Sequence, residues 1–387
     1  MSPASAFHNQ QGLRAVIAGE GCVRERLVPE LDALSLRHPL IVCGANLARS
    51  AALEIVRDAL GRPAAVFDGS RPHTPAETVD AGAAAARAAR ADALIAVGGS
   101  SAVDCAKGIA VLLASGRERV AELSPLHFDR LFEGPREAHA RFPVLCLTTT
   151  LSFAEFMPFW AVRRADLLRK LPYSDLECVD RTVFLDGELA AETPEEVWVE
   201  TGVKALDDAL SAWCRSSGPE PFLDPVLEGA IGELFEALPA SRAPGAAAAR
   251  QRMLVATWMT KLWLPRLRPF ALSNWFSTTA RHALGAVAGV SHGGASCVAL
   301  PHALRFHAAD TRARQAAFAA RLGAEAGGLA PLEPVVAALL ERLRTPRRLC
   351  DLGLERPALA ELVAAMRAES PRLGSEAELL RACEAML

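Results

Sequence analysis

The sequence has little of what marks membrane-bound, secreted or nucleic-acid-binding proteins. No apolar run reaches the roughly 18 residues that a membrane-spanning helix needs. No charged segment near the start leads into an apolar one, so no secretory signal is visible. The net charge of -3 leaves no basic excess for nucleic acid or for an anionic membrane surface. We therefore expect neither a nucleic-acid nor a membrane partner.

Paired cysteines are lacking too. The nine cysteines are scattered along the chain, and none forms a C-x-x-C pair. An odd number at wide spacing does not suit a disulfide framework or a zinc knuckle, whereas it suits reduced thiols. The sequence therefore favours a cytoplasmic enzyme.

The first half of the chain alternates short apolar runs with alanine-rich helical segments. Apolar runs at residues 40–44, 64–68 and 93–97 predict strands, and each is followed by a helical pattern, at 49–60, 76–91 and 102–114. Residues 144–147 and 183–185 predict further strands. This alternation is typical of a parallel sheet covered by helices on both faces. We predict an α/β domain over residues 1–192.

The second half has a different pattern. After about residue 194 the apolar positions recur with helical spacing and β-branched runs are few. Such segments lie at residues 197–213, 225–238, 246–263, 311–322 and 357–367. Since a chain of 387 residues is long enough for two domains, we predict an all-helical domain over residues 193–387.

The clearest local signal is a glycine-rich turn between a strand and a helix. The strand at 93–97 runs into Gly98, Gly99, Ser100 and Ser101, and a helix begins at once. Glycines let the backbone approach an anion, and the first helical N–H groups point at it. The serines could donate to phosphate oxygens or cap the helix. The alternative is an ordinary tight turn with a serine N-cap.

Five ordered motifs resemble the iron-containing alcohol dehydrogenase superfamily, which shares its fold with dehydroquinate synthase. The turn resembles that family's Gly-Gly-Gly-Ser-x-x-Asp-x-Ala-Lys loop, with Ser100 in place of the third glycine. Residues 72–75 and 149–160 resemble the His-Thr-Pro and Thr-Thr-Tyr-Ala-Gly-Ser-Glu-x-x-Pro-x-Trp elements of its maleylacetate reductase branch. Residues 185–189 and 282–302 resemble the remaining two motifs in order and spacing.

The resemblance implies an N-terminal Rossmann-like, dinucleotide-binding domain, a C-terminal helical catalytic domain, and an active site in the cleft between them. It also implies NAD or NADP as cofactor and a homodimer. By the same resemblance, residues 98–101 would face the pyrophosphate, and Thr149 and Thr150 the nicotinamide half. Lys170 would reach the ribose region; the alternative is a solvated loop lysine.

Gly44 bears on the choice of cofactor. In NAD-preferring relatives, the residue ending this strand is often an acid that binds the ribose hydroxyls and repels a 2′-phosphate. Glycine removes that repulsion, and Arg49 is near in sequence. The sequence therefore predicts tolerance of NADP, or a preference for it.

The resemblance breaks down at the metal ligands. Metal-dependent members use one Asp and three His, the first two from a Gly-x-Asp-Ala-x-x-His helix. Here Lys204 stands at the Asp position, Asp208 at the first His position and Thr278 at the second, and only His292 is retained. A protonated lysine is no ligand, and one Asp with one His makes a poor iron or zinc site. We predict no tightly bound metal.

Lys204 could replace the ion. Lys204 and Asp208 are four residues apart on a helix, so they should pair, which would keep the lysine charged and oriented. An ammonium could then polarise a carbonyl oxygen, as the electrophile or proton donor, with His282 and His292 as a proton relay. The alternatives are a plain helical ion pair that fills a vacated cavity, and histidines that only pack or cap.

The leading interpretation is metal-independent hydride transfer between nicotinamide and a secondary alcohol or ketone. The substrate would be a small molecule or a peptide-borne group, as for a biosynthetic tailoring dehydrogenase. One alternative is a non-catalytic, nucleotide-binding relative that serves as a scaffold or partner. The other is a metal-dependent member of the superfamily, dehydrogenase or lyase, with an altered ligand set.

Overall fold

The computed structural model describes residues 13–125, 142–157, 159–164, 169–173, 179–215, 223–243, 245–261, 274–324 and 328–387. The chain forms two compact units. The first contains Met1–Thr193 and Pro244–Arg266, and the second Pro194–Ala243 and Leu267–Leu387.

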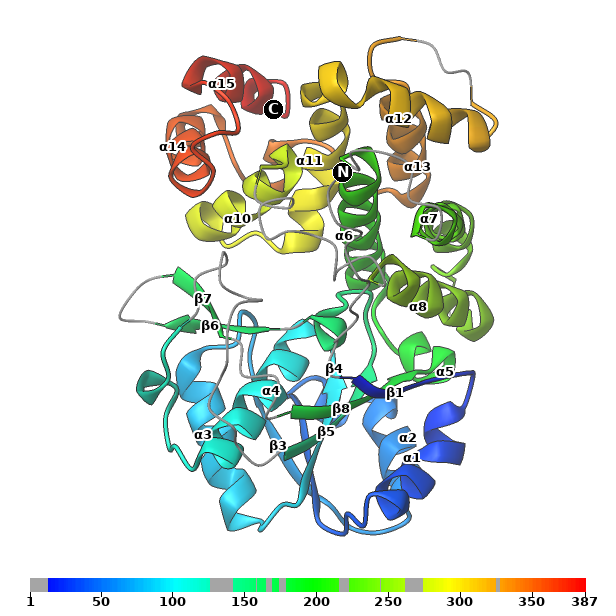
Figure 1. Ribbon diagram of the computed structural model, residues 1–387, viewed down its shortest axis with the longest axis vertical. Coiled ribbons are helices and arrows are strands. Elements are labelled where there is room, and N and C mark those ends of the chain that lie inside the picture. Colours follow the sequence, from blue (N-terminus) through cyan, green and yellow to red (C-terminus); the bar gives the residue numbers. More distant parts are fainter. Residues whose placement is uncertain are drawn as a thin grey trace, which may run out of the picture. The chain divides into compact units, whose positions relative to one another are not determined.

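The first unit is built on a six-stranded parallel sheet with the order β1-β8-β5-β4-β2-β3 (Figure 1). Its strands are β1 (Leu13–Ala18), β2 (Pro39–Gly44), β3 (Ala65–Ser70), β4 (Ala93–Gly98), β5 (Phe142–Thr148) and β8 (Val179–Leu185). The connecting helices are α1 (Cys22–Ala33), α2 (Ala51–Leu60), α3 (Ala76–Ala88), α4 (Ser100–Ser115) and α5 (Gly187–Ala191). A two-stranded antiparallel ribbon, β6 (Trp160–Arg164) and β7 (Arg169–Tyr173), is added to it.

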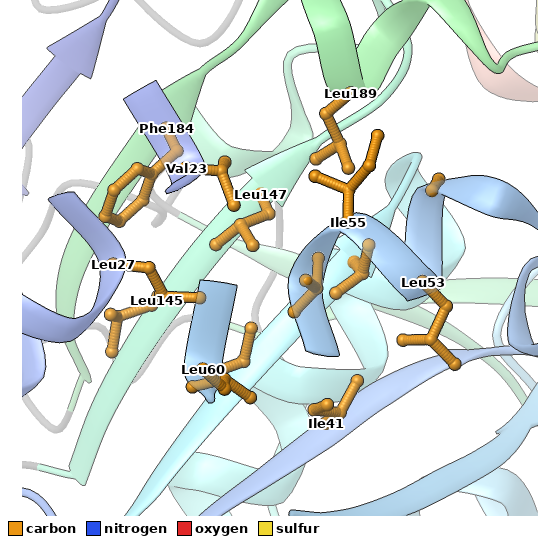
Figure 2. Close-up of a cluster of buried hydrophobic side chains, with 14 of the residues drawn as sticks. Val23, Leu27, Ile41, Leu53, Ile55, Leu60, Leu145, Leu147, Phe184 and Leu189 are labelled. Atoms are coloured by element: carbon orange, nitrogen blue, oxygen red, sulfur yellow. The ribbon is translucent and has the colours of Figure 1, made fainter. Parts of the chain in front are cut away.

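Alternate strand residues face opposite layers of helices. Ile41, Ile95 and Leu145 point to the face that α1 and α2 cover, where Val23 and Leu53 meet them (Figure 2). By strand alternation the intervening residues face the opposite side of the sheet, which α3 and α4 cover (Figure 1). Both faces being covered explains why β2 and β4 are near-continuous apolar runs, and not alternating ones. Each buried aliphatic side chain contributes roughly 1.5–3 kcal/mol, so the sheet is a rigid platform.

The strand order reverses between β2 and β4. From β2 the chain passes to β3 at one edge, crosses back to β4, and continues through β5 to β8. Ligands of open parallel sheets bind beyond the carboxyl ends of the strands at such a reversal. Gly44 ends β2 and Gly98 ends β4, so the two predicted nucleotide-binding positions flank this point.

Helix α8 (Ala247–Lys261) belongs to the first unit, although its residues lie within the predicted helical domain. Gln251 accepts a hydrogen bond from the Gly187 N–H at 2.8 Å, and Arg250 donates to the Thr193 carbonyl at 2.8 Å. A carbon atom on Gly187 would meet the Ala247 carbonyl oxygen at 2.2 Å, so glycine permits this close approach. Helical periodicity alone does not carry this information.

The second unit is helical. It contains α6 (Glu195–Cys214), α7 (Leu223–Ala240), α10 (Phe276–Ala288), α11 (His292–Phe306), α12 (Ala308–Arg321), α13 (Glu333–Leu343), α14 (Leu359–Glu369) and α15 (Glu376–Glu384). Helix α6 packs against α7, α11 and α12, and α10 packs against α11 and α14 (Figure 1). The predicted fold class, a parallel α/β domain with an all-helical one, is confirmed.

Helices α6 and α11 cross closely at one glycine. A Cβ atom on Gly293 would lie 2.6 Å from the Glu200 Cβ, so only glycine fits there. The Ser291 hydroxyl, which caps α11, donates to Glu200 at 2.6 Å. This crossing fixes the start of α11 beside Glu200, in the N-terminal third of α6.

Among the described helices, none has the length and apolar character to cross a lipid bilayer.

Candidate active site

The turn after β4 needs glycine at two successive positions. Gly98 has a φ of +139°, which side-chain-bearing residues rarely adopt. Gly99 has an ordinary backbone, but a Cβ atom there would lie 2.9 Å from the Thr150 Oγ1. The Thr149 N–H donates to the Gly98 carbonyl at 3.1 Å, which ties the turn to the end of β5.

Helix α4 opens directly out of this turn. Gly99 is its N-cap, and Ser100 and Ser101 are its first two residues. The N-cap is therefore glycine and not serine, while the tight strand-to-helix turn of the alternative interpretation is present. A 16-residue helix starts on glycine at the carboxyl edge of the sheet, which is the geometry that binds anions through backbone N–H groups.

Thr149 and Thr150 are buried and held by side-chain hydrogen bonds. The Thr193 hydroxyl donates to the Thr149 carbonyl at 2.6 Å, and the Thr148 hydroxyl to the Thr150 carbonyl at 3.2 Å. The Thr150 hydroxyl donates to Ser152 at 3.0 Å. These bonds fix Thr150, whose side chain packs against Gly99.

Two buried cations that sequence reasoning missed hold the loop beyond Thr150. Lys107, from the motif that contains the glycine turn, donates to the carbonyls of Ala154, Met157 and Phe159, the last two at 3.0 and 3.2 Å. Arg181 donates to the Met157 carbonyl at 2.8 Å. Burial, and to a smaller extent the nearby Arg181, lowers the pKa of Lys107 to about 7. Lys107 and Arg181 thus hold the carbonyl groups of this loop in place.

Phe153 departs from the family motif in a visible way. It stands where the maleylacetate reductase motif has glycine, and it keeps a φ of +54°. The Lys261 ammonium, at the end of α8, lies 3.3 Å from the centre of its ring. A cation over an aromatic face is attracted to the ring electrons, which offsets part of the backbone strain.

Gly44 and Lys170 complete the predicted nucleotide contacts. A Cβ atom on Gly44 would lie 3.3 Å from the Ser70 carbonyl oxygen, so space is limited there. Arg49 is exposed at the end of the short 3-10 helix Leu47–Arg49 that follows β2, and it donates to the Asn46 Oδ1 at 3.4 Å. The Lys170 backbone pairs with Arg163 in the β6–β7 ribbon, but its side chain lies outside the described residues.

In the second unit, Lys204 and Asp208 form the expected ion pair one turn apart on α6. The Lys204 Nζ lies 3.2 Å from the Asp208 Oδ2, and the two side chains are 18 % and 9 % exposed. Burial lowers the pKa of Lys204 to about 8; Asp208 opposes the shift, and Arg281 adds to it.

Arg281 is the main residue that sequence reasoning missed. Its Nη2 donates to the Asp208 Oδ1 at 2.7 Å, and its Nη1 to the Asp207 Oδ2 at 3.0 Å. Its side chain is only 4 % exposed. Burial alone would lower the pKa of Arg281, but the two carboxylates outweigh it and raise that pKa. The signal that the sequence offers is an arginine among the mostly small residues of α10.

Asp207 is braced by hydroxyls from two other helices. Ser277 of α10 donates to its Oδ1 at 2.5 Å, and Ser296 of α11 donates to its Oδ2 at 2.8 Å. The network therefore joins α6, α10 and α11 through one buried carboxylate (Figure 1).

His282 and His292 lie beside each other in the same unit. Their ring centres are 5.3 Å apart and nearly perpendicular. His282 follows Arg281 on α10 and contacts Glu369 of α14, with 2.5 Å between Nδ1 and Oε1. His292 is the first residue of α11. The structure thus brings the predicted residues together as two pairs, Lys204 with Asp208 and His282 with His292.

Within the described ranges, no three His, Cys, Asp or Glu side chains are grouped as metal ligands. Thr278, at one family ligand position, lies 3.4 Å from Arg281. Asp208 stands at another family ligand position, and its two oxygens face the cationic side chains of Lys204 and Arg281.

Comparison with known proteins identifies both units. A family model described as iron-containing alcohol dehydrogenase matches residues 14–187, and one for the C-terminal part of that family matches residues 198–379. Maleylacetate reductase 2 of Cupriavidus pinatubonensis is 29% identical over 315 residues, 81% of this chain and 77% of that protein. The crystal structure of maleylacetate reductase from Agrobacterium tumefaciens matches with a TM-score of 0.76 at 21% identity, over 98% of each chain. That of sulfoacetaldehyde reductase from Bifidobacterium kashiwanohense in complex with NAD+ matches with a TM-score of 0.80 at 22% identity, over 98% of each chain.

Proposed function

This chain belongs to the iron-containing alcohol dehydrogenase family, with resemblance to its maleylacetate reductase branch, and we propose that it catalyses hydride transfer to a ketone, or from a secondary alcohol, without a metal ion. Membership makes it an NAD(P)-dependent oxidoreductase of the alcohol dehydrogenase and reductase kind, as the sequence predicted. The network of Lys204, Asp208 and Arg281 is the observation that carries the metal-free part of the proposal.

The first unit fits a dinucleotide. A Cβ atom at Gly99 would fill space against Thr150, and Gly98 and Gly44 end the two strands between which the sheet order reverses. Residues 98–101 would hold the pyrophosphate, and Thr149 and Thr150 would line the nicotinamide side. Nicotinamide supplies or accepts the hydride when it is bound.

The second unit does not fit the family's metal. An ion at the ligand positions would lie beside the Lys204 ammonium and the Arg281 guanidinium, and both repel a dication. Asp208 already interacts with these two cations at 3.2 and 2.7 Å. A threonine hydroxyl and a single imidazole do not make up the missing donors for Fe²⁺ or Zn²⁺.

The Lys204 ammonium can perform the ion's chemical task. In ketone reduction the carbonyl carbon gains the hydride, and the oxygen becomes an alkoxide that must be neutralised. Lys204 would donate a hydrogen bond to that oxygen and then transfer a proton to it. Asp208 keeps the ammonium oriented, and a pKa of about 8 suits proton transfer in both directions near neutral pH. His282 and His292 would return the proton from solvent.

We further propose that NADP is accepted. No acidic side chain at position 44 repels a 2′-phosphate, and the exposed Arg49 guanidinium follows in the next turn. Guanidinium groups suit phosphate recognition because they donate two parallel hydrogen bonds.

The test begins with purified protein whose iron and zinc content is measured, and with fluorescence titration of NADPH and NADH. A panel of secondary alcohols and ketones is then screened, and Lys204→Met is compared with the wild type. We expect nucleotide binding without stoichiometric metal, and a loss of kcat of at least 100-fold in Lys204→Met. Arg57→Met, which breaks an exposed helical ion pair with Glu54, is the control and should keep full turnover.

Two results would overturn the proposal. One is iron or zinc near one equivalent that is removed together with activity. The other is a folded Lys204→Met variant with full turnover. Nucleotide binding without turnover of any alcohol or ketone would favour the scaffold alternative.

A further inference from the structure

We propose that Arg281 is a positioning residue for this reaction: it bridges Asp207 and Asp208 and so holds Asp208 in the orientation that aims the Lys204 ammonium. This inference rests on the proposed role of Lys204. It assigns a function to a residue that the family's ligand set does not include.

Arg281 contacts the carboxylates of Asp207 and Asp208, and these two carboxylates have different roles. Its Nη1 donates to the Asp207 Oδ2 at 3.0 Å, and its Nη2 to the Asp208 Oδ1 at 2.7 Å. Asp208 turns its other oxygen, Oδ2, to the Lys204 Nζ at 3.2 Å. The orientation of Lys204 therefore depends on a carboxylate whose second oxygen is fixed by the guanidinium.

Asp207 anchors the guanidinium. Ser277 and Ser296 donate to it at 2.5 and 2.8 Å, so its position is set by α10 and α11 as well as by its own helix. Arg281 also donates to the Ser296 hydroxyl at 3.1 Å. Asp207 and Asp208 of α6 and Ser296 of α11 thus hold the guanidinium directly. A planar fork is the group that can bridge two carboxylates.

Lys204 and Arg281 differ in how deeply their side chains are buried, which gives them different roles. The Arg281 side chain is 4 % exposed, whereas that of Lys204 is 18 % exposed. The Arg281 guanidinium is therefore enclosed among its partners, whereas part of the Lys204 side chain remains accessible. Arg281 acts through Asp208 and does not touch the substrate.

The experiment compares Arg281→Lys and Arg281→Ala with the wild type, using an alcohol or ketone that the screen identifies. A lysine keeps the charge but cannot donate to both carboxylates in one plane. We expect kcat to fall at least tenfold in Arg281→Lys, with the Kd for NADPH unchanged within twofold. In Arg281→Ala, added guanidinium at low millimolar concentration should restore kcat at least fivefold, an effect that a merely structural role would not give.

Arg314 provides the matched control. It forms a similar arginine–carboxylate pair with Asp224, at 3.0 and 3.1 Å, in the same helical unit. Arg314→Lys should lower the melting temperature and leave kcat within twofold.

The inference is overturned if folded Arg281→Lys keeps kcat within twofold, or if guanidinium does not raise the kcat of Arg281→Ala. Should both variants fail to fold, Ser296→Ala loosens the same guanidinium without removing a charge. It should lower kcat about threefold, and an unchanged kcat would overturn the inference. Full turnover of Lys204→Met would instead refute the proposed function. An inactive Lys204→Met beside a fully active Arg281→Lys would refute this inference alone.

Discussion

Replacing Gly99 with alanine tests the nucleotide-binding turn through a single added methyl group. The backbone at Gly99 has φ -91° and ψ -161°, which alanine adopts without strain. The effect therefore comes from packing alone. The added Cβ would lie 2.9 Å from the Thr150 Oγ1 and 3.0 Å from its Cγ2, well inside ordinary van der Waals contact.

The Thr150 side chain cannot move away to make room for the added methyl group. Thr150 is 7% exposed, and its hydroxyl donates to Ser152 at 3.0 Å. Inserting a methylene-sized group into such a site costs about 1–3 kcal/mol. For a unit of this size, a cost of about 2 kcal/mol lowers the melting temperature by roughly 4–8 °C. Because the same displacement opens the turn that would hold the pyrophosphate, we expect the Kd for NADPH to rise at least tenfold.

The assay is a double-mutant cycle in urea unfolding with Gly99→Ala, Thr150→Ala and the double variant. Removing both close atoms of Thr150 should relieve the clash, so the double variant should be at least ~1 kcal/mol more stable than the sum of the single effects. Gly229→Ala in α7 is the control, since no described atom lies within 4 Å of its added Cβ and alanine favours the helix. Additive effects, or an unchanged Kd for NADPH in Gly99→Ala, would refute the assignment of this turn.

Three further predictions follow from single groups. Gly44→Asp should raise the Kd for NADPH at least tenfold relative to that for NADH, and equal changes for both nucleotides in fluorescence titrations would contradict it. Burial lowers the pKa of Lys204 to about 8, and the ammonium is the proposed proton donor, so the rate of ketone reduction should fall as the pH rises through about 8. In Lys204→Arg this alkaline fall should disappear from the pH–rate profile. Burial lowers the pKa of His307 from 6.5 to about 4, and its Nε2 accepts from the Phe276 N–H at 3.0 Å. Since the folded pKa lies below the unfolded one, stability should be lost as the pH falls from about 6.5 to 4, and His307→Gln should flatten that part of the urea-midpoint curve.

The sequence predicted those elements that have a clear hydrophobic pattern within their own residues. Strands β2 and β4 are buried on both faces and end at glycine, so they are visible as bounded apolar runs. Strand β1 escaped prediction because it is a half-exposed edge strand without a clear alternation. Helix α1 contains Pro29, which weakens a helical pattern.

Helices α10 and α11 show why the rest of the fold was not predictable. Helix α11 contains Gly293, Gly294 and Pro301, which are poor helix formers. Its stability comes from packing on α6, where Gly293 meets Glu200. Tertiary contacts of this kind outweigh local propensity, and no window of sequence contains them.

The same distinction separates the predicted from the missed residues of the site. Lys204 and Asp208 pair across one helical turn, so their spacing predicted the contact. Arg281 meets Asp208 across 73 positions, and nothing local announces the partner. Lys107 was equally hidden, because its carbonyl partners lie about 50 residues away in a loop.

The buried charges around Lys204 in the second unit depend on one another. A lysine at the family's Asp position would by itself be a buried cation without a partner, which costs roughly 3–5 kcal/mol. Asp208 at the neighbouring ligand position supplies its counter-charge, and Arg281 balances the charge of Asp207. Two cations thus meet two carboxylates, and removing any one of the four leaves an unpaired buried charge. Unrelated losses of metal ligands would not produce a group of two cations and two carboxylates, paired with one another, in which the more exposed cation is the lysine. This consistency supports the proposal that the altered ligand positions replace the metal.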